Sequence, residues 1–542
     1  MILFDYTLPG TLPGNSESVW SNRAIQPVAA GPLTPFSFTV LEEIIRRAWD
    51  TYYDRLGFAP PARANVLRAY QGRAYLNLSI TAKLEAQQAG VAPIILRVNG
   101  TPWPLAPWEK PGLLGGFKFA RAQKKIDEQL AQLASQIEAT TQQAQIWHIK
   151  TREAHWNQAE ILQVMEEIER AGRDSMMAFW AARHQLTNLY ARLLAAGAEG
   201  HDPQQTLLLL NSALADLTGL VESEMAAAII DIAEQVQNPD AAIAWLKAGD
   251  YQNWRTEFPS RPAAEALADF FLRFGHRAMG EGELANPRWN EDPTMVMRSL
   301  LACIEYHPRR PAKMPAVNYA QKALETLQPA ARKEGRQMLE RLHEMHTLQS
   351  RALHALAFIL AGTRRWALAA AQEAMSDGRL RSPDEIFFFE LEEIKLMMTG
   401  EWNISAQEEI RATLAQRQAQ HAAHQTGYPS DMLIGEQEAQ PVRQGLPGVA
   451  GHAGGPLRRW TATRKNGCHH TIMGAEMLDS GWALGLPLAD GFVAALGSPL
   501  DPLVAAARAW HHPVVVGLGD AYRSMIDGAQ TTLDGDSATA SQ

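Results

Sequence analysis

The sequence predicts a multidomain, mainly α protein, in which a large helical domain is followed by a small C-terminal α/β domain. The chain of 542 residues is long enough for roughly two to four domains with a sizeable core. Residues 18–430 show helical periodicity and few strand signals. Residues 448–542 instead alternate short apolar runs with a single Ala-rich segment, which is typical of a small α/β fold.

Runs of good helix formers define the helical domain. Residues 118–196 are rich in Ala, Gln, Glu, Leu and Lys, and apolar residues such as Ile126, Leu130 and Leu133 recur at helical spacing. We expect at least two long helices there, which could form an extended arm. Further helices are expected at residues 203–238, 263–274, 293–306 and 316–361.

Gly and Pro mark the predicted domain boundaries. Residues 1–17 are interpreted as an N-terminal extension, and residues 18–430 as the helical domain. Residues 431–447 lie in a stretch rich in Gln, His, Gly and Pro, and we interpret them as a linker. The C-terminal domain then covers residues 448–542.

The C-terminal domain is predicted element by element. Asp490–Leu496 is an apolar run that ends at Gly497, as a buried strand meeting a turn would. Leu503–Trp510 is Ala-rich and carries Arg508 in its last turn, so it predicts a short helix. Pro513 stops this helix, and the following Val514–Val516 run predicts a second buried strand.

Composition and charge exclude several classes of protein. The net charge is −9 with basic residues scattered along the chain, which does not favour nucleic-acid binding. The two cysteines, Cys303 and Cys468, lie far apart and suit a reducing compartment. No apolar run reaches the roughly 20 residues that span a bilayer, and the N-terminus lacks the features of a signal peptide. We therefore expect a soluble, cytoplasmic protein with no membrane contact.

The segment from Gly497 to Gly517 carries a recognisable pattern. It is similar to the signature Gly-Gly-x-x-Ser-His-x-Ala, then Ala-Arg, then Ile-Pro and a Val-rich strand. Without gaps, Gly497 falls on the first Gly, Asp501 on the Ser and Pro502 on the His. The region resembles the swivelling phosphohistidine domain of the phosphoenolpyruvate-utilising enzymes, which include phosphoenolpyruvate synthase and rifampicin phosphotransferase.

The position that the resemblance assigns to the catalytic histidine holds a proline. An imidazole can accept a phosphoryl group and pass it on, whereas Pro502 has no nucleophilic side chain. Asp501 also adds a negative charge where an anionic phosphoryl group would arrive. His511 and His512 are weak candidates for a substitute acceptor, and the interpretation of each as a surface or packing residue is favoured.

The helical domain resembles the same family, in particular its rifampicin phosphotransferase branch. The segments that carry this resemblance follow the order of the family and are Trp20–Pro35, Gly72–Leu78, Phe274–Pro293 and Ser382–Glu393. The family's complete enzymes begin with an ATP-grasp domain, and this sequence shows no Gly-rich loop of the kind that cradles phosphates. The resemblance therefore implies no ATP binding on this chain, except through a separate partner.

A cluster of polar residues is the candidate substrate-binding site. His276, Arg277, Glu281, Glu283 and Arg288 place a titratable base, two fixed cations and two carboxylates in one segment. Arg can clamp an anionic group and His or Glu can act as a general base. The alternative is a buried network that ties helices together. No metal site is predicted, because Cys468, His469 and His470 have no second cluster at zinc spacing.

Three functions remain open from the sequence. In the first, the chain is a non-phosphorylating relative that binds a small, partly apolar organic molecule in its helical domain. In the second, it is the substrate and swivelling component of a split, ATP-dependent phosphotransferase or condensing enzyme with a separate ATP-grasp subunit. In the third, it is a structural or regulatory partner of a full-length paralogue. Homo-oligomerisation is compatible with each of them.

Overall fold

The chain forms two compact units in the computed structural model. Unit 1 comprises residues 1–182, 280–286 and 351–442, and unit 2 comprises residues 183–279, 287–350 and 443–542. The division runs through two long helices, α4 (Gln158–Gly197) and α12 (Arg332–Ser376). The structure describes residues 5–9, 18–89, 95–105, 113–151, 158–197, 203–215, 217–311, 319–401, 407–442, 445–459 and 470–542.

Unit 1 contains an eight-stranded sheet in the order β3-β4-β2-β7-β8-β1-β5-β6. Its strands are β1 (Asp5–Thr7), β2 (Val19–Ser21), β3 (Leu67–Tyr70), β4 (Arg73–Asn77), β5 (Ile95–Val98), β6 (Thr101–Pro104), β7 (Met432–Ile434) and β8 (Gln437–Pro441). The β1–β5 pair is parallel and the other neighbouring pairs are antiparallel. Trp20 pairs with Leu433 and Tyr6 with Pro441, so the sheet joins distant parts of the sequence.

This sheet is a feature that the sequence interpretation missed. Its strands are only three to five residues long. Runs this short do not establish a two-residue periodicity, and two of them, β6 and β8, contain Pro. The segment 431–447, interpreted as a linker, contains β7 and β8 and the start of β9.

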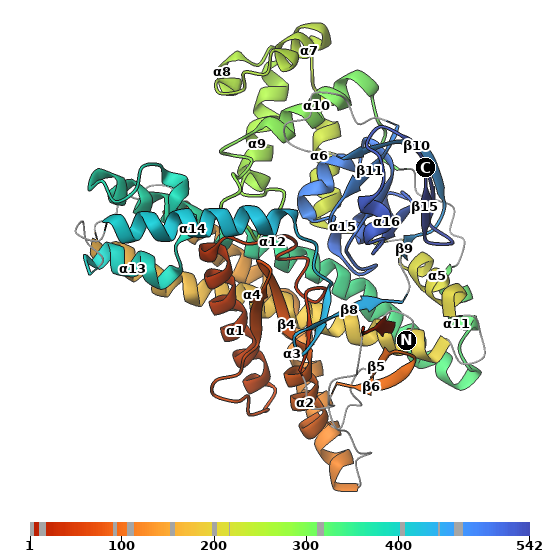
Figure 1. The fold of residues 1–542 in the computed structure, drawn as a ribbon. Coiled ribbons are helices and arrows are strands. Elements are labelled where there is room, and N and C mark those ends of the chain that lie inside the picture. Colours follow the sequence, from red (N-terminus) through yellow and green to blue (C-terminus); the bar gives the residue numbers. More distant parts are fainter. Residues whose placement is uncertain are drawn as a thin grey trace. The chain divides into compact units, whose positions relative to one another are not determined.

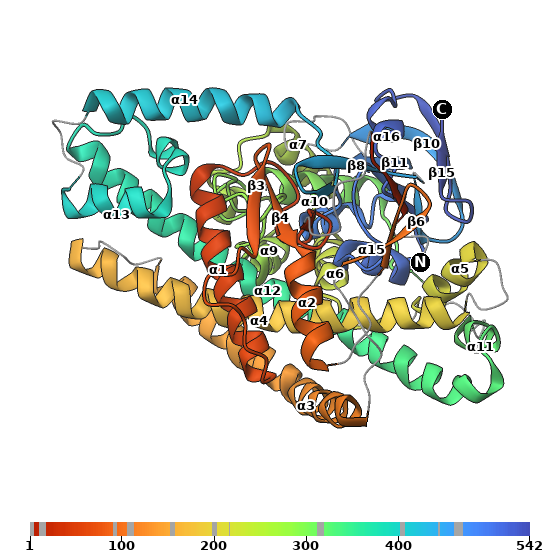
Figure 2. The same ribbon diagram turned by 60° about the horizontal axis from the view of Figure 1, so that its bottom comes forward.

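Unit 1 also contains helices. They are α1 (Pro35–Arg55), α2 (Leu78–Ala89), α3 (Leu113–Lys150), α13 (Leu391–Thr399), α14 (Gln407–Thr426) and the 3-10 helix η3 (Pro383–Phe388), together with parts of α4 and α12. Figure 2 shows β3 and β4 next to α1 and α2. A side chain at Gly172 of α4 would meet Ile44 of α1, and one at Gly362 of α12 would meet Trp147 of α3.

Unit 2 combines short helices with a seven-stranded sheet. The helices are α5 (Pro203–Ala213), α6 (Val221–Glu234), α7 (Pro239–Ala248), α8 (Trp254–Glu257), α9 (Arg261–Phe274), α10 (Thr294–Tyr306), α11 (Tyr319–Glu325), η2 (Pro329–Ala331), η5 (Ser480–Gly485), α15 (Pro502–Ala509) and α16 (Asp520–Arg523), with the remaining parts of α4 and α12. The predicted helical character of the middle of the chain is confirmed by these elements.

The second sheet has the order β15-β14-β10-β11-β12-β13-β9. Its strands are β9 (Leu446–Val449), β10 (His452–Arg459), β11 (Thr471–Ala475), β12 (Ala489–Ala494), β13 (Val514–Val516), β14 (Gln530–Asp534) and β15 (Thr539–Ser541). The four strands from β10 to β13 run parallel, and the pairs at both edges are antiparallel. Figure 1 shows α15 and α16 beside these strands, and the predicted C-terminal α/β region is confirmed.

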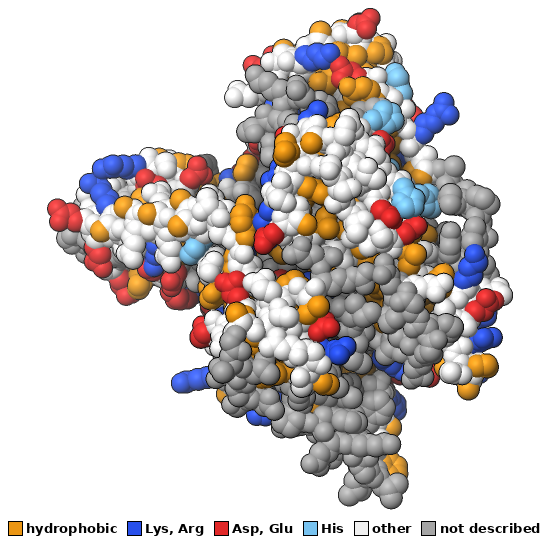
Figure 3. Space-filling view, turned by 45° about the vertical axis from the view of Figure 1, so that its right-hand side comes forward, with side chains coloured by type: hydrophobic (Ala, Val, Ile, Leu, Met, Phe, Trp, Pro, Cys, Tyr) orange, Lys and Arg blue, Asp and Glu red, His pale blue; other side chains and the backbone are white. Residues whose placement is uncertain are grey.

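Two further observations concern the charges on the surface and the apolar character of the helices. On the face drawn in Figure 3, acidic and basic side chains are interspersed among hydrophobic and uncharged polar ones. No helix within the described ranges has both the length and the apolar character that a membrane-crossing segment needs.

Candidate functional site

The segment that carries Asp501 and Pro502 is the loop between β12 and α15. The chain turns at Gly497, whose φ of +121° is a conformation that favours glycine. Asp501 is the N-cap of α15 and Pro502 is its first helical residue, a place where a missing backbone N–H costs nothing. The Asp501 carboxylate accepts a hydrogen bond from the Ser498 backbone N–H at 2.7 Å. The N-cap residue Asp501 and the following Pro502 therefore explain why the loop ends and α15 begins at this point.

The Asp501 carboxylate is buried and paired. Only 1% of the residue is exposed, and Oδ1 lies 3.0 Å from Nη2 of Arg183 on α4. Arg183 Nη1 donates to the carbonyl of Leu500 at 3.0 Å, and Gln349 Nε2 of α12 donates to the same carbonyl at 3.0 Å. A carboxylate that is removed from water needs such partners. The loop is thus hydrogen-bonded to two helices of the same unit.

Neither candidate histidine lies at this loop. α15 is eight residues long, about 12 Å at a rise of about 1.5 Å per residue. His511 and His512 follow its C-terminal end, whereas Asp501 and Pro502 stand at its start. His512 Nε2 contacts the Leu486 carbonyl at 2.8 Å, and its ring stacks on Trp510. Burial lowers the pKa of His512, so it is held as a neutral, packed ring.

Two other titratable side chains are buried in the interior of unit 2. Arg508 of α15 donates from Nη2 to the carbonyls of Gly448 and Pro499, and its Nε and Nη1 have no hydrogen-bond partner among the described residues. Burial lowers the pKa of Arg508 to about 10. His346 of α12 is 1% exposed, and within the described part of the chain neither ring nitrogen is hydrogen-bonded. The sequence pattern marked Arg508 as part of the predicted helix, but it gave no signal for His346, whose neighbours come from distant segments.

Glu222 of α6 is a third buried ionisable group, with no measurable exposure. Its two carboxylate oxygens accept hydrogen bonds from Ser350 Oγ of α12 at 2.6 Å and from Ser480 Oγ of η5 at 2.7 Å. Ser350 Oγ also accepts the backbone N–H of Val221 at 2.9 Å. The carboxylate therefore bridges a helix of the middle region and the C-terminal region.

The segment predicted to bind substrate is divided between the two units. His276, Arg277 and Arg288 belong to unit 2, and each of the three is at most 2% exposed. The backbone N–H of Trp289 donates to the Arg277 carbonyl at 2.9 Å, which closes the turn that carries these side chains. Three buried polar side chains on one closed turn form a rigid group.

Glu281 and Glu283 belong to unit 1. The Glu283 carboxylate accepts hydrogen bonds from the Thr34 N–H at 2.6 Å, the Thr34 hydroxyl at 2.9 Å and the Ser37 hydroxyl at 2.7 Å. These groups lie at the N-terminus of α1, where backbone N–H groups lack helical partners and an anion is favoured. Glu283 therefore holds the start of α1.

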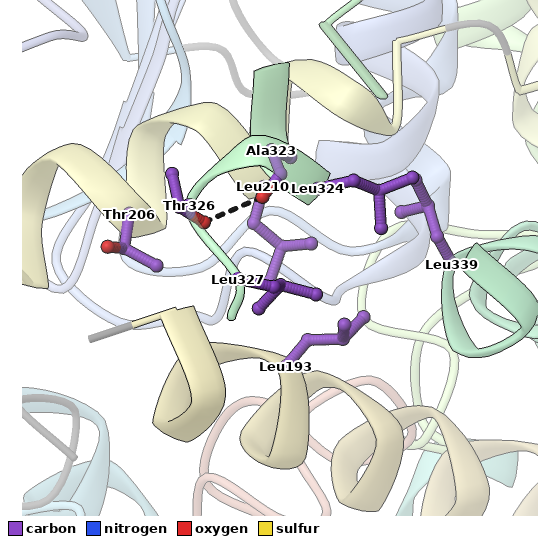
Figure 4. A pocket seen from close by; sticks show the side chains of 8 residues that line it. All are labelled: Leu193, Thr206, Leu210, Ala323, Leu324, Thr326, Leu327 and Leu339. Carbon is purple, nitrogen blue, oxygen red and sulfur yellow. Dashed lines mark hydrogen bonds between the residues drawn. The ribbon is translucent and has the colours of Figure 1, made fainter. Parts of the chain in front are cut away.

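An apolar pocket lies between helices α4, α5, α11 and α12 of unit 2 (Figure 4). Its cavity volume is about 10 Å³, which is room for about one water molecule. Five leucines form most of the wall, and Thr206 and Thr326 add hydroxyl groups at 3.3 Å from the Gly197 carbonyl and 2.6 Å from the Ala323 carbonyl, respectively. The lining residues are Leu193, Thr206, Leu210, Ala323, Leu324, Thr326, Leu327 and Leu339.

One group of side chains in the described ranges could share a divalent cation. His452, Asp534 and Asp536 lie at the joined ends of β10 and β14, with ligand atoms within 4.8 Å of one another. His452 is 67% exposed by its side chain, and Asp534 already accepts hydrogen bonds from Ser537 and Asp536. We assign no metal to it. Cys468 and His469 lie outside the described residues.

Comparison with known proteins gives the class to which these features belong. Residues 170–367 match the family described as "Rifampicin phosphotransferase fourth domain", and residues 468–538 match "PEP-utilising enzyme, mobile domain". A curated relative, "Prodigiosin synthesizing transferase PigC" of Serratia marcescens, is 26% identical over 365 residues. That match covers 61% of this chain and 40% of the relative.

The matches fit the architecture of unit 2. The matched residues cover much of the helical middle of the chain and most of the α/β region that follows it. Two parts of the chain are therefore similar to the phosphoenolpyruvate-utilising enzymes, and to rifampicin phosphotransferase among them. The chain spans less than half of the length of the curated relative.

Proposed function

We propose that this chain binds a small, partly apolar organic molecule in its helical region and does not carry phosphohistidine on the loop before α15. The observation that supports this best is the loop itself. Pro502 offers no nucleophile, and the carboxylate of Asp501 is already paired with Arg183 at 3.0 Å. Phosphoryl transfer to a side chain needs a nucleophile that the substrate can approach. Neither residue meets that need.

The apolar pocket of Figure 4 is the proposed ligand site. All its lining residues fall within residues 170–367, the part that matches the rifampicin phosphotransferase fourth domain. Its cavity of about 10 Å³ is far smaller than a typical ligand pocket, so a ligand would enter only as the leucine side chains move apart, and it is expected to be small. The leucines favour an apolar body, and the hydroxyl groups of Thr206 and Thr326 provide a polar edge.

The predicted substrate-binding residues have a more limited part in this proposal. Glu283 already accepts several hydrogen bonds at the start of α1. His276, Arg277 and Arg288 are candidates for recognising a polar group on a ligand, because their fixed geometry suits an anion or a carbonyl.

The first experiment tests phosphoryl transfer. The purified chain is incubated with ATP labelled at the β or the γ phosphate, and separately with labelled phosphoenolpyruvate. We expect no label on the protein. Acid-labile, base-stable label on this chain would show that it carries phosphohistidine and would contradict the proposal.

The second experiment tests the pocket with indole as the probe. We expect indole to enter as the leucine side chains move apart and to raise the midpoint of thermal unfolding, and Leu210→Trp to abolish that increase by occupying the same space. Leu272→Trp serves as the control, because Leu272 is 69% exposed and lies outside the pocket lining. An equal increase in wild type and Leu210→Trp would contradict binding at this site.

A second function is favoured by the transferase relative. Because the relative is described as a transferase, the chain would act as the substrate and swivelling component of an ATP-dependent phosphotransferase or condensing enzyme. A separate ATP-grasp subunit would supply ATP, and His511 or His512 would be the remaining acceptors. Labelling that requires both the partner and these histidines would favour this function over the first.

A further inference from the structure

We propose that the C-terminal region is fixed to the helices of unit 2 by a buried latch and does not move as an independent domain. The latch consists of Arg183, Glu222, Gln349 and Ser350 on the helices, and of Ser480, Leu500 and Asp501 on the C-terminal region. The matched family is described as a "mobile domain", so this chain would differ from that description. The inference concerns motion and holds whatever ligand the helical region binds.

The charged half of the latch surrounds the loop before α15. Side-chain exposure is 10% for Arg183 and 2% for Asp501, so water does not screen their attraction. Arg183 contacts both the Asp501 carboxylate and the Leu500 carbonyl, and Gln349 reaches that same carbonyl from α12. A buried ion pair adds little net stability. It does fix the position of the C-terminal region on the helices, because any shift leaves a buried charge without its partner.

The other half of the latch is the carboxylate of Glu222. It accepts one hydrogen bond from Ser350 on the helical side and one from Ser480 on the C-terminal side. If the C-terminal region moved away, Glu222 would lose its contact with Ser480. On the C-terminal region, Ser480 lies at the start of η5 and Asp501 lies directly before α15. Because the two halves of the latch make contact at different places, they restrain rotation as well as separation.

Apolar contacts supply the free energy that holds the latch closed. All six residues of η5 are buried, and η5 contacts α6 and α10. α15 also contacts α6, and β9 contacts α5. Relative motion is the usual expectation for two domains, unless the interface between them is large and apolar. Here whole elements of the C-terminal region are buried against helices.

Gly481 shows how tightly the two sides fit. A Cβ atom at this position would lie 2.4 Å from the Ala278 carbonyl oxygen and 2.7 Å from the Met279 Cα. Both neighbours are backbone atoms, so no side chain can rotate away to make room. Gly481→Val is therefore a wedge between η5 and the helical side that leaves the charged groups of the latch unchanged.

The first test measures hydrogen–deuterium exchange in the full-length chain. We expect Gly481→Val, and separately Arg183→Gln with Asp501→Asn, to speed amide exchange in α6 and α15 by at least about tenfold. Helix α1 of unit 1 should stay unchanged, which separates local opening from global unfolding. Gly454→Ala is the matched control, because a Cβ there meets nothing within 4 Å. Unchanged exchange in both latch variants would overturn the proposal.

The second test needs no destabilising variant. Spin labels are placed at Ala268→Cys in α9 and Thr532→Cys in β14, both of them exposed positions of unit 2, in a Cys468→Ser background. Cys303 should remain unlabelled, because it is 1% exposed and burial raises the pKa of its thiol to about 12. We expect one narrow distance distribution between the two labels. A broad or two-peaked distribution would show a mobile region and would overturn the proposal.

Discussion

At the scale of the residue, Asp501 changes what the loop before α15 can do. Its carboxylate lies 3.0 Å from Arg183 and forms a buried ion pair with it. A phosphoryl group that approached this loop would have to compete with that carboxylate for the same cation. The charge on Arg183 is thus already compensated inside the chain.

His346 gives a prediction about pH and stability. Burial, and then the positive charges of Arg508, His343 and Arg183, hold the pKa of His346 well below its usual value of 6.5. The unfolded chain therefore takes up a proton first as the pH falls through about 6.5. Stability that is present above about pH 6.5 is lost as the pH falls from there toward the folded-state pKa.

We expect His346→Leu to flatten this pH dependence. The variant should also be more stable by about 1 kcal/mol at pH 7, because it removes a buried polar group without hydrogen bonds among the described residues. Urea unfolding between pH 5 and 8 measures both effects. His452→Gln, at an exposed position, is the control and should keep the wild-type profile. A His346→Leu profile as steep as that of the wild type would contradict the prediction.

Sequence reasoning at this scale could place Asp501 and Pro502 at the start of a helix, because N-cap and first-turn preferences are local. It could not find Arg183, which is 318 positions away in the sequence. It also could not tell that Glu283 caps α1 while His276 and Arg277 lie in another unit. Such pairings depend on packing between distant elements, which periodicity does not encode.

At the scale of the element, glycines decide how closely the helices of unit 1 approach one another. At Gly362 of α12, an added Cβ would lie 1.8 Å from the ring of Trp147 on α3. At Gly172 of α4, it would lie 2.8 Å from Ile44 of α1. Both glycines lower intrinsic helix propensity, so their presence inside long helices is explained by this close packing.

Two Gly→Ala variants separate packing from helix propensity. Gly362→Ala should destabilise the protein by about 1–3 kcal/mol, because Trp147 must move in a packed core. Gly116→Ala, in α3 with nothing within 4 Å of the added Cβ, should instead stabilise it by about 0.5–1 kcal/mol. Thermal and urea unfolding of the two variants would give these signs. Equal effects from both would contradict the packing argument.

The elements that were predicted correctly are those whose signal lies within their own residues. The long helices and the strand, helix, strand order of β12, α15 and β13 follow from composition and spacing. The sheet of unit 1 was missed because β2 and β7 are three residues each and pair across more than 400 positions. A three-residue strand is stabilised by its partners rather than by its own sequence.

At the scale of the whole molecule, unit 2 depends on the C-terminal region for partners of its buried charges. A chain that ends at Val442 loses Ser480 and Asp501 and so leaves Glu222 and Arg183 with fewer partners. We expect faster hydrogen exchange in α6 and α10 of this truncated chain, with α1 of unit 1 still protected. Equal protection of α6 and α10 in the two chains would show that the helices are stable without the C-terminal region.

The strand order of the sheet in unit 1 has a consequence for how the protein is made. Strands β1, β5 and β6 form one group and β2, β3 and β4 another, and only the β7–β8 hairpin at residues 432–441 joins them. A ribosome therefore has to produce more than 430 residues before the sheet can close. Until then β1 and β2 each have an open edge, and such edges pair readily with other chains. The period of greatest risk of aggregation would fall during synthesis, and binding of a chaperone to the nascent chain would be expected to matter most then.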